Sequence, residues 1–146
     1  MTGLGGLIAG RTEPGVYRWR STARSADVIA LAEAANWRAM ALDGSAIHDK
    51  ASLLDAFAAG FSFPDWFGRN WDALADCLGD LSWLGESSGY LVLFEDWPVL
   101  AGADADAFAT TLDILRTTSD IWRSRKEPFA VLLRPWMSLP ELPLLG

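Results

Sequence analysis

Residues 63–81 constrain the fold more than any other part of the sequence. An aromatic loop containing one proline and one glycine leads into a short helix. Asn70 is a suitable N-cap for this helix, because its side-chain oxygen can accept a backbone N–H that lacks an intrahelical partner. Gly79 is the expected C-terminal stop. Apolar residues at helical spacing predict one buried stripe, made of Leu74, Cys77, Leu78 and Leu81.

The opposite side of this helix carries an acidic ridge, which consists of Asp72, Asp76 and Asp80. Like charges one turn apart repel by roughly 0.2–0.5 kcal/mol per pair, and no Lys or Arg stands three or four residues after any of the three. Asp80 also lies near the negative end of the helix dipole. Two interpretations follow: a surface for a positively charged partner, or a solvated helix face.

The distribution of charge argues against nucleic acid as a direct ligand. The net charge is −7, and residues 61–122 hold eleven of the nineteen acidic residues against only two bases, Arg69 and Arg116. Phosphate contacts need Lys and Arg, so direct nucleic-acid binding is not expected. The acidic middle of the chain favours a basic protein, a metal ion or a cationic ligand.

Length and composition predict one globular domain over residues 1–146. The single cysteine excludes an internal disulfide and is typical of a reducing cytoplasm, where we expect the protein. Residues 1–10 lack a basic region, and their apolar run is broken by glycine, so no signal peptide is expected. No stretch approaches the roughly 20 apolar residues of a membrane span, and we expect no membrane association.

Apolar strands alternate with helical patterns along the chain. This order predicts an α/β fold with a mostly parallel sheet of three to four strands, packed with helices. The two continuous apolar runs, 90–94 and 129–133, are typical of strands covered on both faces. The other expected strands are 16–20 and 37–42, and the other expected helices are 25–35, 49–60 and 103–124. Three prolines predict an irregular tail over 134–146.

The segment from Pro64 to Leu78 resembles the central motif of the barstar family, intracellular inhibitors of a secreted guanyl-specific ribonuclease. It reads PDWFGRNWDALADCL. The family pattern has Pro, an acid, two aromatics, Gly, any residue, Asn, a hydrophobe, Asp-Ala-Leu and, after one further residue, Asp-Cys-Leu, and every fixed position matches. The resemblance covers residues 37–133 and implies a barstar-like core. Residues 1–36 then form an N-terminal extension, for which extra packing or an additional edge strand is expected.

The resemblance implies that the acidic helix blocks the basic active site of a secreted microbial ribonuclease in a 1:1 complex. Asp76 matches the central binding aspartate of the family, Asp72 the acid one turn before it, and Trp66 an aromatic that packs against the nuclease. The implied partner-binding set is completed by Gly68, Asn70 and Trp71, with Arg69, Ala75 and Asp80 as possible rim residues.

The motif departs from the family pattern in a few places. Ala75 stands where the family has a tryptophan, and Trp66 replaces a tyrosine. The family also has an acidic contact from its last helix, for which Asp113 and Asp120 are the candidates here. A second interpretation therefore remains open, in which a barstar-fold module binds some other basic protein.

Catalysis is a less favoured interpretation, and no cofactor or metal is expected. The only histidine, His48, precedes a predicted helix as a surface or capping residue, and Cys77 lies on an apolar helix side. The enzyme alternative rests on Asp72 and Asp76 as an acid–base pair or as ligands of a divalent cation. Further ligands could then come from the end of a strand, at Glu95 and Asp96.

Overall fold

The computed structural model describes residues 3–137, 139 and 141–146. Its centre is a five-stranded sheet in the order β2-β3-β4-β1-β5, in which every pair of neighbours is parallel. The strands are β1 (Val16–Trp19), β2 (Trp37–Asp43), β3 (Gly89–Glu95), β4 (Phe129–Arg134) and β5 (Leu144–Leu145). The α-helices are α1 (Leu4–Ile8), α2 (Ser25–Ala34), α3 (Lys50–Gly60), α4 (Trp71–Asp80), α5 (Pro98–Ala103) and α6 (Ala105–Ser124), and two short 3₁₀ helices are η1 (Gly44–Ala46) and η2 (Ser82–Leu84).

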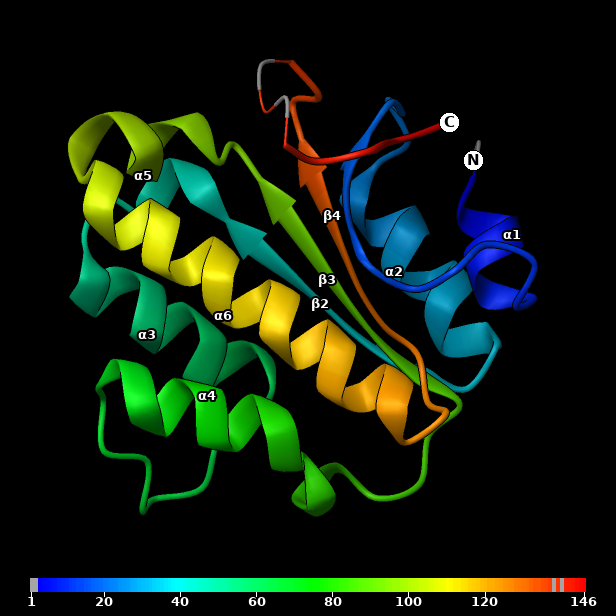
Figure 1. Cartoon of the computed structure of the whole chain (residues 1–146), viewed down its shortest axis with the longest axis horizontal. Helices are drawn as coiled ribbons and strands as arrows, with labels where there is room; N and C mark the ends of the chain where they lie inside the picture. Colours follow the sequence, from blue (N-terminus) through cyan, green and yellow to red (C-terminus); the bar gives the residue numbers. More distant parts are fainter. Residues whose placement is uncertain (1–2, 138, 140) are drawn as a thin grey trace.

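Helices cover both faces of the sheet (Figure 1), so the α/β architecture expected from the sequence is confirmed. Successive residues of β3 alternate between two buried clusters: Val92 and Phe94 pack with α3 to α6, whereas Leu91 and Leu93 pack with α1 and α2. This alternation explains why the central strands read as continuous apolar runs, because side chains that point to either face are buried.

Segments outside the barstar-like core complete the second cluster, together with residues of β3 and β4. Leu4 and Leu7 from α1 and Leu145 from β5 pack there against the sheet. β1 pairs with β4 on one side and with β5 on the other, so it is an inner strand and not an edge strand. The sheet therefore has more strands than the three to four expected. The tail expected to be irregular contributes the fifth, two-residue strand, which is too short to show a sequence period.

Two helix boundaries differ from expectation for identifiable reasons. α4 continues through Gly79 to Asp80, and Leu81 takes the left-handed cap conformation with φ of 53°. A leucine is unusual there, but its side chain is fully buried in the core, which offsets the backbone cost. Asp104 separates α5 from α6, because its carboxylate accepts the Ala107 N–H at 3.0 Å and caps the second helix.

A largely buried ion pair joins the extension to the ends of two central strands. The Arg134 guanidinium donates from Nε to Glu95 Oε1 at 2.8 Å and from Nη2 to Oε2 at 2.6 Å. Nη1 of Arg134 donates to the carbonyls of Ser21 and Ala23 in the loop between β1 and α2. Burial alone would raise the pKa of Glu95, but hydrogen bonds from Arg134 and Ser25, together with the Arg134 charge, outweigh it and lower that pKa.

Within the described ranges, no helix combines the length and the apolar character needed to cross a membrane.

Candidate functional site

The acidic helix α4 is fixed in place from its first residue. Asn70, in extended conformation, accepts the Ala73 N–H on its side-chain oxygen at 2.8 Å, as expected of an N-cap. The apolar stripe is fully buried, which confirms the predicted inner face of the helix. The indole N–H of Trp122 on α6 donates to the Leu78 carbonyl at 2.8 Å. These contacts present the opposite face of α4 to solvent.

That opposite face is an unpaired acidic ridge. Asp72, Asp76 and Asp80 are all exposed, and in the described part of the chain none of the three forms an ion pair. Asp80 accepts the Ser82 N–H at 3.2 Å, which offsets part of its unfavourable place at the helix C-terminus. Because no Lys or Arg of the described residues forms an ion pair with the ridge, its charge is available to a basic partner.

The ridge also affects the thiol beneath it. Cys77 is fully buried, as expected of a core residue. Burial raises the pKa of the Cys77 thiol, and the nearby charges of Asp76 and Asp80 raise it further. The thiolate is therefore disfavoured at neutral pH, so the site contains no activated cysteine.

Arg69 lies beside the ridge but is bound to another helix. Its Nε donates to Asp55 Oδ1 at 3.0 Å and its Nη2 to Oδ2 at 3.1 Å, a bidentate contact with α3. Asp55 thus balances the charge of Arg69 and ties the end of the loop to α3. Asp55 was not predicted from the sequence, because fourteen residues separate the partners and no local period links them.

Residues 61–70 form an aromatic loop that precedes α4; it is named the recognition loop after the contact role expected of Trp66. Trp66 is 62% exposed, the expected state for an aromatic that contacts a partner. Phe63 and Phe67 are partly buried against the core, so they pack inside the protein. A side chain at Gly68 would crowd the capping amide, since a Cβ at this position would lie 3.3 Å from Asn70 Nδ2.

The remaining expected contact residues differ in how much of each side chain a partner could reach. Trp71 is half-buried, with the Lys50 ammonium 5.2 Å from its ring centroid, so only part of it is accessible. Ala75 is exposed on α4 directly before Asp76, where its methyl group offers little contact area. Asn70 is exposed as well, but its side chain is committed to capping.

Asp113 and Asp120 do not supply an acid beside α4. On α6 they lie about 180° and 200° around the helix from Trp122, which faces α4. Asp120 instead pairs with Arg123 at 3.0 Å. Neither aspartate is therefore placed to extend the ridge.

The carboxylates of the metal or acid–base alternative are also separated. Figure 1 shows α4 and the carboxyl end of β3 at opposite sides of the molecule. Glu95, at that end of β3, is held by Arg134 and Ser25. Among the described residues, no group of three or more His, Cys, Asp or Glu side chains could hold a metal ion. His48 is exposed.

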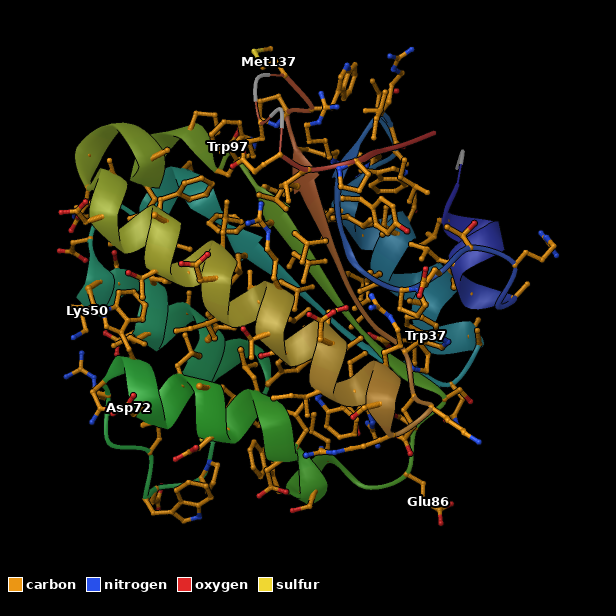
Figure 2. All side chains as sticks on the ribbon, in the orientation of Figure 1. Trp37, Lys50, Asp72, Glu86, Trp97 and Met137 are labelled. Atoms are coloured by element: carbon orange, nitrogen blue, oxygen red, sulfur yellow. The ribbon has the colours of Figure 1, made fainter. Side chains whose placement is uncertain are left out.

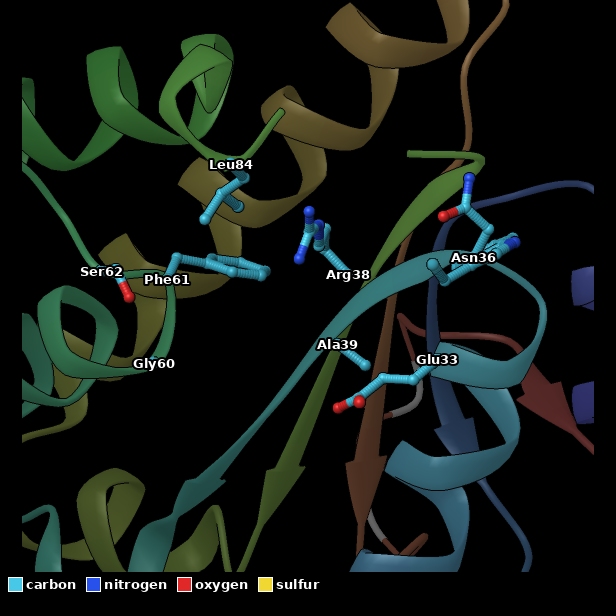
Figure 3. Close-up of a pocket in the computed structure, with 9 residues that line it drawn as sticks. Glu33, Asn36, Arg38, Ala39, Gly60, Phe61, Ser62 and Leu84 are labelled. Atoms are coloured by element: carbon cyan, nitrogen blue, oxygen red, sulfur yellow. The ribbon is translucent and has the colours of Figure 1, made fainter. Parts of the chain in front are cut away.

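A hollow of about 370 Å³ lies along the N-terminal half of the edge strand β2 (Figure 3). Its two charged residues, Glu33 and Arg38, lie on different sides of the β2 ribbon and do not converge on one point. The other lining residues are Asn36, Trp37, Ala39, Gly60, Phe61, Ser62 and Leu84. This set contains no nucleophile paired with a base, so the hollow does not resemble a catalytic site.

The fold and this surface define a class: an α/β protein with a parallel sheet that presents an acidic helix and an exposed tryptophan, a combination suited to a basic protein. A family model described as Barstar (barnase inhibitor) matches residues 37–134. The chain belongs to the barstar family. No match to the chain is found among curated proteins.

Proposed function

We propose that this protein inhibits a secreted guanyl-specific ribonuclease of the barnase type. One observation carries the proposal: in a chain of the barstar family, the acidic ridge of α4 is exposed and unpaired beside an exposed Trp66. A ribonuclease binds phosphate oxygens with Arg, Lys and His side chains. The Asp72 and Asp76 carboxylates would occupy the phosphate positions and accept charge-assisted hydrogen bonds from those groups.

The inhibitor would act in the cytoplasm of the cell that exports the nuclease, as a binding protein and not as an enzyme. Trp66 would pack against the nuclease next to the charged anchors, with Gly68, Asn70 and Trp71 around it. A large aromatic beside buried charges is the usual composition of a binding hot spot. Complementary charge would mainly accelerate association, so added salt should lower the association rate more than it raises the dissociation rate.

The test is titration of a guanyl-specific ribonuclease with the protein while RNA cleavage is followed, using wild type and Asp76→Ala. We expect stoichiometric 1:1 inhibition, with a loss of about 2 kcal/mol or more in the variant. Asp113→Ala is the matched control, because it removes the same charge from an exposed site on the far side of α6 and should inhibit like wild type. Equal inhibition by Asp76→Ala would exclude α4 as the anchor.

A second candidate function is binding of a different basic protein. The exposed Ala75 favours this candidate, because the family is expected to have a tryptophan at that position. A second observation also favours it: among the described residues, the face of α6 that packs beside α4 carries no acid. A folded wild-type protein that inhibits none of several guanyl-specific ribonucleases would support this candidate. The acidic ridge would then still be required, and Asp76→Ala should reduce binding to the partner found.

A further inference from the structure

Trp83 contacts the recognition loop at three points. It lies in η2, directly after α4, and its indole N–H donates to the Phe61 carbonyl at 2.8 Å. Its ring meets Phe63 edge to face at 5.8 Å between centroids, and meets Trp66 in the same way at 6.1 Å. The indole therefore connects the segment after α4 to the loop before it.

The loop needs such support because its backbone is irregular. The described stretch between Gly60 and Trp71 contains no helix or strand, and Ser62 and Arg69 both have positive φ. Backbone hydrogen bonds to this stretch include those from Phe63 N–H to Ala58 O and from Phe67 N–H to Pro64 O. Trp66, at 62% exposed, has the Trp83 ring as its aromatic neighbour inside the protein. The Trp83 ring is therefore a contact that can fix the orientation of Trp66.

We infer that Trp83 is a positioning residue, which holds Trp66 and the recognition loop in their binding conformation before a partner arrives. The inference rests on the proposed function and adds a residue outside the contact set expected from the sequence. Ordering a loop and a large side chain on binding costs affinity, and this cost is reduced when they are already ordered. The bidentate contact between Arg69 and Asp55 holds the other end of the loop. Trp83 thus acts through Trp66.

The test is a double-mutant cycle on ribonuclease inhibition with Trp66→Ala, Trp83→Ala and the double variant. We expect Trp83→Ala to weaken inhibition roughly three- to tenfold, the range of one aromatic pair. The combined loss in the double variant should be smaller than the sum of the two single losses, because removal of Trp66 takes away a main part of what Trp83 positions. Additive losses, or wild-type inhibition by Trp83→Ala, would overturn the inference. If Trp83→Ala does not fold, Trp83→Phe takes its place in the same cycle.

Trp97→Phe is the matched control for Trp83→Phe. The indole N–H of Trp97 also donates to a backbone carbonyl, that of Pro135, at 2.6 Å. Figure 2 shows Trp97 on the opposite side of the molecule from Asp72. Both substitutions remove one such bond, but Trp97→Phe should leave inhibition unchanged.

A measurement on the free protein separates failure of this inference from failure of the proposed function. Amide hydrogen exchange should accelerate roughly tenfold at Phe63 and Phe67 in Trp83→Ala, while exchange in the centre of α6 stays as in wild type. A wild-type protein that inhibits no ribonuclease would remove the proposed function only. Unchanged exchange at both loop amides, or equal acceleration throughout the chain, would overturn the positioning role.

Discussion

The ion pair between Glu95 and Arg134 should be the most sensitive polar contact in the fold, and Glu95→Gln tests it. The substitution preserves the shape of the side chain but removes its charge. Arg134, only 10% exposed, then keeps its positive charge with neutral acceptors alone, namely the Ser21 and Ala23 carbonyls and the single amide oxygen of the new glutamine, whose NH₂ group cannot accept. Removal of one partner from a buried pair costs about 3–5 kcal/mol. Because the Glu95 side chain is 23% exposed and water screens part of the interaction, we expect about 3 kcal/mol.

Urea unfolding followed by circular dichroism measures this loss. The transition midpoint should fall with little change in slope, since the surface exposed on unfolding is nearly the same. The double variant Glu95→Leu/Arg134→Met should be less destabilised than Glu95→Gln, because it leaves no unpaired buried charge.

The pH dependence of folding stability tests the sign of the Glu95 contribution. The folded-state pKa of Glu95 is lowered from its ordinary value of 4.5, so its contribution is complete above that value and is lost as pH falls through the folded-state pKa. The difference in stability between wild type and Glu95→Gln should therefore shrink on acidification below about pH 4.5. A loss under about 1 kcal/mol at neutral pH, or a difference that does not change with pH, would refute this account of the pair.

Two further predictions concern the buried faces of the sheet and of α4. The Cys77 thiol should not react with a thiol reagent such as Ellman's reagent in the native protein, and it should react fully in urea. Rapid reaction of the native protein would contradict the burial and the raised pKa of this thiol. Leu7→Ala should lower the free energy of unfolding measured in urea by about 2–5 kcal/mol, because Leu7 is buried in the second core. A loss as small as that of Leu31→Ala, at an exposed position, would show that α1 is dispensable for stability.

The local structure of the acidic helix could be predicted from the sequence because its signals are local. The capping by Asn70 and the buried stripe depend on spacings of three and four residues, which the helix period fixes. The continuous apolar runs likewise predicted that β3 and β4 are strands buried on both faces. The family motif also lies within one continuous segment, so its resemblance needed no tertiary information.

The contacts that hold the candidate site together were not predictable in this way. Asp55 binds Arg69 and Trp83 supports Trp66 across fourteen and seventeen residues, through side chains from separate elements. No period in the sequence connects such partners. Two further binding candidates, Asp113 and Asp120, could be judged only once the rotation of α6 was known.

The sequence by itself determined an α/β protein with an acidic, well-capped helix and a barstar-like motif, because propensity, capping and periodicity act over a few residues. Only the tertiary structure decided which charges remain free. It paired Arg69 with Asp55 and Glu95 with Arg134, and it left the ridge of α4 without an intramolecular cation in the described chain. It also decided the role of residues 1–36 and of the tail, whose apolar side chains complete the second core. Pairing and burial of this kind depend on distances between remote segments, which the packed fold alone defines.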